Sequence, residues 1–233
     1  DDDYHLPSIW CAGGDKDGAC AADPDNAEVL LVPDSVGFAH ECFAYQDTRT
    51  AACADELTNE LVPTDRVNNV QGLYPTVFYR VMNAFIGPDV ERSVLVMRMV
   101  NALIFTGLLG LALFVLSPAV RSAVTATVLV VFVPLGLFVI PSTNPSSWTL
   151  TGITFLWAFG LAFTRRRSWR SRRTWFLAAA TVVSAVLAIG SRVDAAAYVI
   201  VVVVVIFLLT GVTALKRAWI ATSVLVVVTV LGI

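Results

Sequence analysis

From Ser93 to its last residue, the sequence consists of long apolar stretches separated by short polar loops. Backbone polar groups cannot stay unsatisfied in lipid, so apolar stretches of this kind favour membrane-spanning helices. Only 15% of all residues are charged, against about 25% in soluble domains. We therefore predict an all-α polytopic membrane protein, and we exclude an ordinary soluble globular enzyme.

The apolar part divides into six predicted transmembrane helices. They cover residues 93–116, 123–140, 148–164, 174–190, 195–215 and 218–233. The last would rise only about 24 Å, less than the roughly 30 Å hydrocarbon core, so we expect it to be truncated within a span. The sequence also opens on an acidic run without an initiator Met. We expect the chain to be a fragment that lacks at least one anchor helix before Asp1.

The loops between the predicted helices differ in charge. The first, third and fifth loops hold nine Lys and Arg residues, six of them between Arg165 and Arg173, whereas the second and fourth hold only Arg192. The positive-inside rule places the basic loops in the cytoplasm. The first predicted helix then runs from outside to inside, so residues 1–92 are predicted to be exoplasmic.

Residues 1–92 form a segment of different composition, with 17 acidic and five basic side chains and all four cysteines. Four cysteines allow three pairings. We favour Cys11 with Cys20 and Cys42 with Cys53, because these pairs close short local loops and an exoplasmic compartment permits disulfides. The gaps between the cysteines do not resemble those of a zinc site.

Residues 74–87 predict an amphipathic helix at the end of this segment. Pro75 suits a first helical position, and Gly87 with Pro88 ends the pattern. The apolar side chains on one face are Val77, Phe78, Val81, Met82 and Phe85. Two interpretations stay open: an interfacial helix on the outer membrane surface, and a helix packed on its own small domain.

The acidic start is the first candidate site. Asp1, Asp2, Asp3 and His5 place carboxylates and an imidazole within a few residues. Such groups can act as a general base or hold a divalent cation with oxygen ligands. The alternative is a solvated acidic run without a role in chemistry. The sequence assigns no specific metal.

Two arginines are candidates for substrate binding. Arg98 lies about five residues into the first predicted helix, with Asn101 three residues further on the same face. An intramembrane Arg is costly and often functional, and its guanidinium suits a lipid phosphate, although it can also snorkel outward. Arg192 and Asp194 lie at the outer mouth of the fourth and fifth predicted helices, close enough to form a structural ion pair instead.

Missing motifs argue against several function classes within this fragment. The sequence has no phosphate-binding G-x-x-x-x-G-K-[ST] loop, no G-x-S-x-G and no H-E-x-x-H. This argues against an ATP-driven pump and the common hydrolases. The Arg165–Arg173 loop is explained by topology and by attraction to anionic cytoplasmic lipid, and we predict no nucleic-acid binding.

Four short motifs fall on the predicted exoplasmic side. They are Asp1 and Asp2 with His5, the stretch from Tyr74 to Tyr79, Asn144 with Pro145, and Ser191 and Arg192 with Asp194. In this order they resemble D-E-x-x-H, H-P-P-L-Y-Y, N-P-D and S-R-x-D of the bacterial multi-pass membrane proteins called domain of unknown function 2142 (DUF2142). That family is in turn similar to GT-C glycosyltransferases. Ser146 replaces the acid of the third motif.

The resemblance implies an enzyme of the bacterial plasma membrane that passes a sugar from a polyprenyl-phosphate donor to a cell-envelope glycan acceptor at the outer face. Asp1 or Asp2 would be the base, in one motif with His5. The residues that would bind substrate are Arg98, Asn101, Tyr79, Asn144, Arg192 and Asp194. The rival hypothesis is a non-enzymatic flippase, transporter or scaffold, which predicts midplane polar residues and repeated discontinuous spans.

Overall fold

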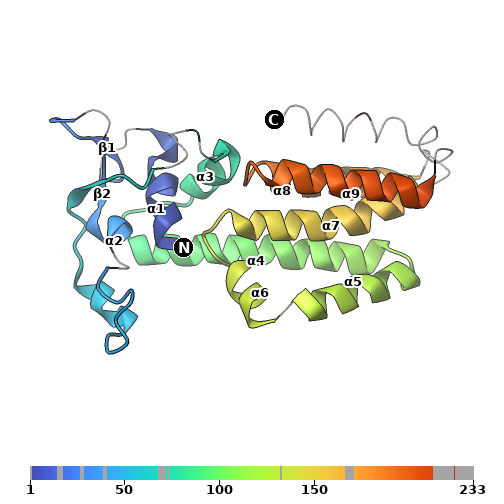
Figure 1. The fold of residues 1–233 in the computed structure, drawn as a ribbon, viewed down its shortest axis with the longest axis horizontal. Helices are drawn as coiled ribbons and strands as arrows, with labels where there is room; N and C mark the ends of the chain where they lie inside the picture. The colour runs from blue at the N-terminus through green and yellow to red at the C-terminus, as the bar shows by residue number, and fades with distance from the viewer. Residues whose placement is uncertain are drawn as a thin grey trace. The chain divides into compact units, whose positions relative to one another are not determined.

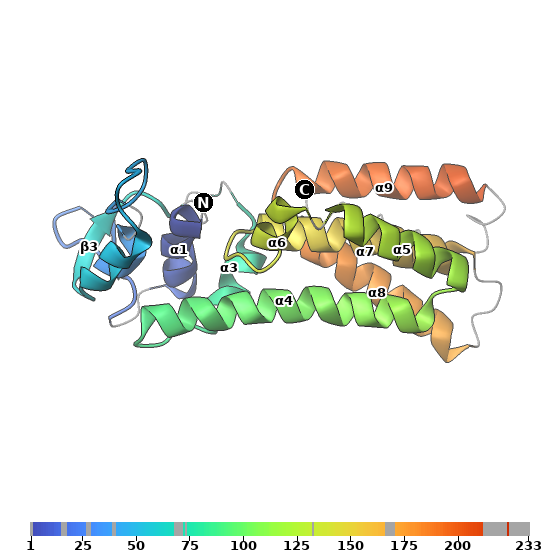
Figure 2. The same ribbon diagram turned by 90° about the horizontal axis from the view of Figure 1, so that it is seen from below.

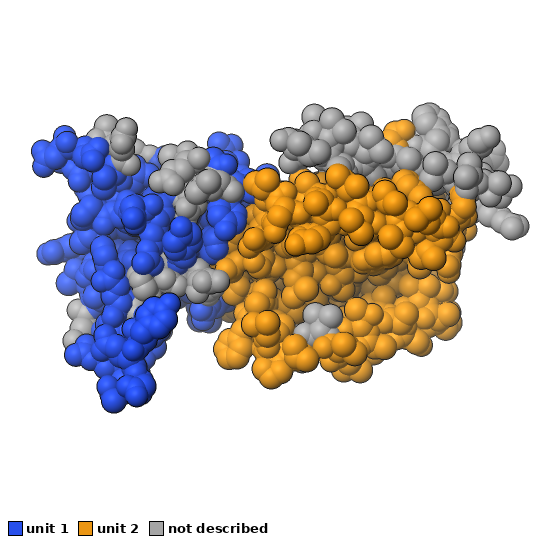
Figure 3. Space-filling view, in the orientation of Figure 1, with its two compact units in different colours: residues 1–98 blue, residues 99–233 orange. Residues whose placement is uncertain are grey.

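The computed structural model describes residues 2–14, 18–26, 29–38, 41–67, 72, 74–131, 133–165, 171–211 and 223. It is mainly helical and consists of two compact units, unit 1 with residues 1–98 and unit 2 with residues 99–233 (Figures 1 and 3). The boundary between the units falls inside the continuous helix α4 (Val90–Val115).

Unit 1 combines short helices with a small antiparallel sheet. Its helices are α1 (Asp2–Trp10), α2 (Asp34–Gly37), α3 (Thr76–Asn83) and the 3-10 turns η1 (Cys11–Gly13) and η2 (Ala51–Glu56). The sheet has the order β1 (Ala21–Ala22), β2 (Leu30–Pro33) and β3 (Leu61–Thr64), with Val32 opposite Val62. The all-α prediction is corrected here. Strands of two to four residues are too short to show the alternating pattern by which sequence reveals them.

Helix α3 packs against α1 and η1. Phe78, Tyr79 and Met82 are fully buried, whereas Val77 and Val81 are 42% and 40% exposed. One face of α3 is therefore buried within unit 1, and the other is partly exposed. A second link to α1 comes from Asn83 at the end of α3, whose Nδ2 donates hydrogen bonds of 2.9 and 3.1 Å to the last carbonyls of α1.

Two disulfides constrain unit 1, and both join the cysteines predicted from the sequence. Cys11 pairs with Cys20, and Cys42 pairs with Cys53, with Cα–Cα distances of 5.2 and 6.0 Å. The first links η1 to the residue before β1, and the second links the segment after α2 to η2. Each closes a loop of about ten residues, which lowers the entropy of the unfolded chain.

Unit 2 is a helical bundle. It contains the rest of α4 and the helices α5 (Pro118–Val131), α6 (Pro134–Val139), α7 (Ser146–Thr164), α8 (Arg172–Ile189) and α9 (Ala195–Thr210). Helices α7, α8 and α9 run side by side (Figures 1 and 2). Phe155 and Phe159 of α7 and Leu177 of α8 are buried in one core cluster. A second cluster joins Leu156 of α7 to α8 and α9.

Close packing between α7 and α8 depends on a glycine. A Cβ on Gly152 would lie 2.5 Å from the carbonyl oxygen of Ser184 and 2.7 Å from the amide nitrogen of Ala188. Both neighbours are backbone atoms, so a rotamer change cannot relieve the clash. Small residues at such positions let helix backbones approach closely in membranes.

Among the described residues, three helices are long and apolar enough to cross a membrane: α4, α7 and α8. Helices α5 and α9 are apolar but shorter. The helix predicted over residues 123–140 is corrected to two helices, α5 and α6, which Figure 2 shows as separate. Val133 is extended, and Pro134 at the start of α6 cannot donate a backbone hydrogen bond to continue α5.

The other predicted helices agree more closely with the helices of the structure. Residues 93–116, 148–164, 174–190 and 195–215 correspond to α4, α7, α8 and α9. The predicted helix 218–233 lies outside the described residues except for Ser223, as do residues 166–170 of the basic loop. Arg173 of that loop has a structural contact, because its Nε donates a 2.8 Å hydrogen bond to the carbonyl of Val115 and so caps α4.

Candidate functional site

The loop between α8 and α9 carries an ion pair that the sequence suggested. Arg192 donates from Nε to Asp194 Oδ1 at 2.9 Å and from Nη2 to Oδ2 at 3.3 Å. Two parallel bonds of this kind match the planar guanidinium to the carboxylate. A third bond of 3.2 Å runs from Nη1 to Ser146 Oγ. Arg192 therefore joins this loop to the first residue of α7.

The Arg192 hydrogen bond is the main reason that the pKa of Asp194 lies below its ordinary value. Partial burial opposes this shift, while the charge of Arg192 and two backbone N–H groups add to it. Asp194 is therefore a carboxylate at neutral pH. The side chains of Arg192 and Asp194 are 31% and 49% exposed, so water and small anions can reach the pair.

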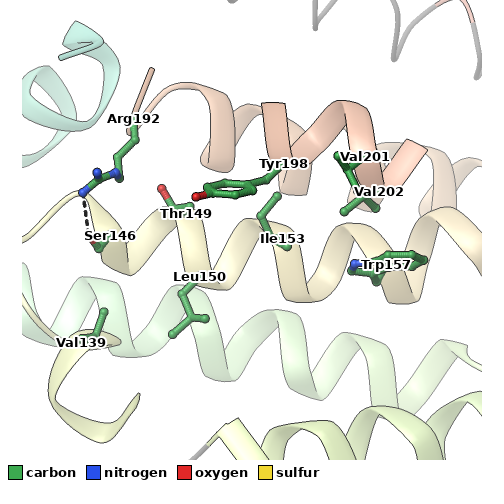
Figure 4. Close-up of a pocket in the computed structure, with 10 residues that line it drawn as sticks. All are labelled: Val139, Ser146, Thr149, Leu150, Ile153, Trp157, Arg192, Tyr198, Val201 and Val202. Carbon is green, nitrogen blue, oxygen red and sulfur yellow. Dashed lines mark hydrogen bonds between the residues drawn. The ribbon is translucent and has the colours of Figure 1, made fainter. Parts of the chain in front are cut away.

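A pocket of about 500 Å³ begins beside this ion pair. We call it the α7–α9 groove, because α7 and α9 contribute most of its lining (Figure 4). Its lining consists of Val139, Ser146, Thr149, Leu150, Ile153, Trp157, Arg192, Tyr198, Val201 and Val202. Figure 4 shows Arg192 and Ser146 at one end and Trp157 toward the other. Along α7, the eleven residue steps from Ser146 to Trp157 correspond to about 16 Å of helix rise.

The polar end of the groove is fixed by further hydrogen bonds. Thr149 Oγ1 lies 2.8 Å from Ser191 Oγ, which donates to the carbonyl of Ala188 at 2.8 Å. Asn144 Oδ1 accepts a 2.8 Å bond from the amide of Ser146. These contacts hold the start of α7 against the end of α8. The motifs around Asn144 and Ser191, which are remote in sequence, therefore meet at this end of the groove.

Asn101, a predicted substrate-binding residue, is 1% exposed and fully engaged by the protein. Its Nδ2 donates to the carbonyl of Ser142 at 2.6 Å, and its Oδ1 accepts a 2.9 Å bond from Trp148 Nε1. The side chain thus holds the turn before α7 and the first turn of α7. Arg98, three residues earlier in α4, is exposed, so only one residue of this predicted pair has an accessible side chain.

A second cluster lies inside unit 1. His5 is 4% exposed and Tyr79 is fully buried, and Nδ1 of His5 lies 2.9 Å from the Tyr79 hydroxyl. The ring of Tyr74 meets the imidazole edge-on at 5.3 Å. The histidine motif and the Tyr74–Tyr79 stretch therefore come together, although 74 residues separate His5 from Tyr79.

The acidic residues before His5 are less fully described. Asp1 lies outside the described residues, and Asp2 begins α1. Within the described part of the chain, no three His, Cys, Asp or Glu side chains group closely enough to hold a metal ion.

Sequence reasoning missed most of the groove. One sequence pattern could have pointed to the groove. On α7, every fourth residue lies on the same helix face, and Thr149, Ile153 and Trp157 have this spacing. Tyr198 is the one polar aromatic residue in the valine-rich sequence of α9. Neither pattern identifies a groove without knowledge of which helices pack together.

A family model described as "Predicted membrane protein (DUF2142)" matches residues 1–233. No curated protein and no solved structure matches the chain.

Proposed function

Because the chain belongs to the DUF2142 family of predicted membrane proteins, we propose that it acts on a lipid substrate as a GT-C-like glycosyltransferase with a polyprenyl-phosphate-linked sugar as donor. The observation that carries this proposal is the α7–α9 groove. It combines a guanidinium and three hydroxyl-bearing side chains with an otherwise apolar lining. A groove with one polar end and one apolar end matches a ligand that has a charged head and a hydrocarbon chain.

The polar end suits a phosphate. Arg192 is held in one orientation by Asp194 and Ser146, so little side-chain entropy remains to be lost when an anion binds. Charge-assisted hydrogen bonds from guanidinium to phosphate are among the strongest that proteins make. The Tyr198 hydroxyl and Ser146 add neutral donors at the same end of the groove. The phosphate of the donor would lie here.

The rest of the groove suits an isoprenoid chain. Leu150, Ile153, Trp157, Val201 and Val202 offer apolar surface without a charged group among them. Burial of apolar ligand surface contributes about 25 cal/mol per Å². A soluble nucleotide-sugar would gain little from this surface, whereas a polyprenyl chain would cover it.

The proposed reaction is a substitution at the anomeric carbon of the sugar. The acceptor hydroxyl oxygen forms a bond to C1, the bond between C1 and the phosphate oxygen breaks, and the hydroxyl proton passes to a carboxylate base. The resemblance assigns that base to Asp1 or Asp2. Arg192 would stabilise the charge that develops on the departing lipid phosphate.

We also propose that residues 1–92 are exoplasmic, as the charge of the loops predicts. The two disulfides of unit 1 support this orientation, because disulfides persist in oxidising compartments. A donor carried on the outer leaflet would then be on the same side of the bilayer as the acceptor.

A transporter or flippase for lipid-linked sugars is the second candidate, and the interruption between α5 and α6 favours it. Discontinuous helices are typical of transporters, where they form substrate sites near the bilayer midplane. The two candidates differ in products. A flippase would move the intact donor across vesicle membranes, whereas a glycosyltransferase would consume the donor and release polyprenyl phosphate.

The test is the binding of polyprenyl phosphate to the full-length protein in lipid nanodiscs, measured by native mass spectrometry. We expect Arg192→Gln to weaken binding about 10- to 100-fold, since a hydrogen bond to a charged group is worth about 1.5–3 kcal/mol. Arg121→Gln removes the same charge from an exposed position on α5 and should leave binding unchanged. Polyprenol, which lacks the phosphate, should bind both proteins equally.

Trp157→Ala tests the apolar half of the groove. It should weaken binding of a long-chain polyprenyl phosphate more than that of a short-chain analogue, because only the long chain reaches Trp157. Equal affinity of wild type and Arg192→Gln for polyprenyl phosphate would refute the assignment of the groove as the donor site. Absence of binding by wild type would refute it as well.

A further inference from the structure

Unit 1 contains a pocket of its own that none of the predicted site residues lines. It has a volume of about 340 Å³ and lies between the end of β3, the end of α2 and the turn that follows α2. This volume is at the lower end of the roughly 300–1,000 Å³ that small-molecule sites occupy. The residues that matter for its chemistry are Phe38, Glu41, Pro63, Thr64, Asp65 and Arg66.

The β3 wall of the pocket is fixed by hydrogen bonds. Thr64 pairs with Leu30 in the sheet, and its Oγ1 accepts a 3.2 Å bond from the amide of Arg66. Ser8 of α1 donates a 3.1 Å bond to the carbonyl of Arg66. The Arg66 guanidinium lies 5.8 Å from the centroid of the Tyr4 ring, within the range of a cation–π contact.

The opposite wall is equally constrained. The amide of Phe38 donates a 2.9 Å hydrogen bond to the carbonyl of Asp34, and the amide of Glu41 donates a 2.9 Å hydrogen bond to the carbonyl of Phe38. The Cys42–Cys53 disulfide directly follows Glu41. Both walls therefore exist before a ligand arrives, and this lowers the entropic cost of binding.

The charges of the pocket select its ligand. Glu41 and Asp65 provide two carboxylates against the single guanidinium of Arg66, so the pocket disfavours phosphates and other anions. Within the described residues, neither carboxylate takes part in a side-chain hydrogen bond or ion pair. A hydrocarbon chain would strip water from both carboxylates without replacing their hydrogen bonds. The pocket therefore disfavours a hydrocarbon chain as its occupant.

A neutral sugar can form hydrogen bonds with both carboxylates and carries no charge that either would repel. Its hydroxyls can donate to the two carboxylates, and its oxygens can accept from Arg66. Phe38 and Pro63 supply apolar surface for the C–H face of a sugar ring. We propose that this pocket binds a neutral saccharide with free hydroxyl groups. The inference goes beyond the proposed function, because saccharide binding in unit 1 does not depend on glycosyl transfer or on the α7–α9 groove.

The experiment uses the full chain in nanodiscs on a printed array of neutral oligosaccharides, phosphorylated saccharides and Lys-rich peptides. Wild type should bind at least one neutral oligosaccharide. The Glu41→Gln, Asp65→Asn double variant keeps side-chain size but replaces charged acceptors with neutral amides. It should lose at least tenfold in affinity for that oligosaccharide. Glu60→Gln, an exposed acid that does not line the pocket, is the matched control and should bind like wild type.

The outcomes separate this inference from the proposed function. The double variant should still bind polyprenyl phosphate as wild type does, because the α7–α9 groove belongs to unit 2. Thermal unfolding of the double variant should match that of wild type, which verifies that unit 1 is folded. Absence of neutral saccharide binding by wild type would overturn the inference, as would binding of Lys-rich peptides alone. Equal saccharide binding by wild type and the double variant would overturn it as well, whatever the outcome for the groove.

Discussion

Replacement of Gly152 by Ala should destabilise the packing of α7 on α8. The added Cβ would approach the Ser184 carbonyl oxygen to 2.5 Å and the Ala188 nitrogen to 2.7 Å, so the helices must separate. Overpacking of this kind costs about 1–3 kcal/mol. In the other direction, Ala stabilises a helix by about 0.5–1 kcal/mol relative to Gly. The net expected loss in the free energy of unfolding is therefore between about 0 and about 2.5 kcal/mol.

The matched control is Gly110→Ala, on the exposed side of α4, where an added Cβ meets no atom within 4 Å. At this position only the higher helix propensity of Ala changes the stability, so this variant should be about 0.5–1 kcal/mol more stable than wild type. Both variants can be unfolded by SDS in mixed micelles and followed by circular dichroism. Shifts of the same sign and size in the two variants would refute the close approach of α7 and α8.

Three further outcomes are expected. Asn101→Leu should destabilise the protein by about 2–4 kcal/mol in the same SDS titration, since it removes the buried hydrogen bonds of Asn101 to Trp148 Nε1 and to the carbonyl of Ser142; an unchanged midpoint would argue against these bonds. Because the pKa of Asp194 is lowered in the folded state, its ion pair with Arg192 should be fully formed above the ordinary carboxyl pKa and be lost only as pH falls through the lowered value. Polyprenyl-phosphate affinity should therefore show no step attributable to Asp194 between about pH 5 and 8, and a step abolished by Asp194→Asn would contradict this. Replacing either disulfide by a pair of serines should lower the stability of unit 1 by about 2.5–3 kcal/mol, the loop-closure entropy of a loop of about ten residues, measured by thermal unfolding; no change would show that the loop is constrained by other contacts.

Local patterns in the sequence predicted much of the helical architecture. The long apolar runs that become α4, α7, α8 and α9 are bounded by Pro, Gly or Arg, and these boundaries are visible without a structure. The disulfide pairing followed from the same kind of local information, because each pair closes a short loop.

Features that depend on tertiary packing could not be predicted in this way. The apolar run over residues 123–140 continues through Pro134, so composition did not reveal the break between α5 and α6. Asn101 resembled an exposed polar group near Arg98, yet its partners are 41 and 47 residues away. The α7–α9 groove exists only because α9 packs beside α7, and a single sequence does not specify helix neighbours.

The central claim is tested most directly by transfer of radiolabelled sugar from polyprenyl-phosphate donors to acceptor, with the full-length protein in membrane vesicles. We predict transfer by wild type, with release of polyprenyl phosphate. At least a tenfold loss is expected in Arg192→Gln and in Asp2→Asn when both are present at wild-type amounts. Absence of transfer by wild type across a panel of donors, or undiminished transfer by both variants, would contradict the account and favour transport of the intact lipid.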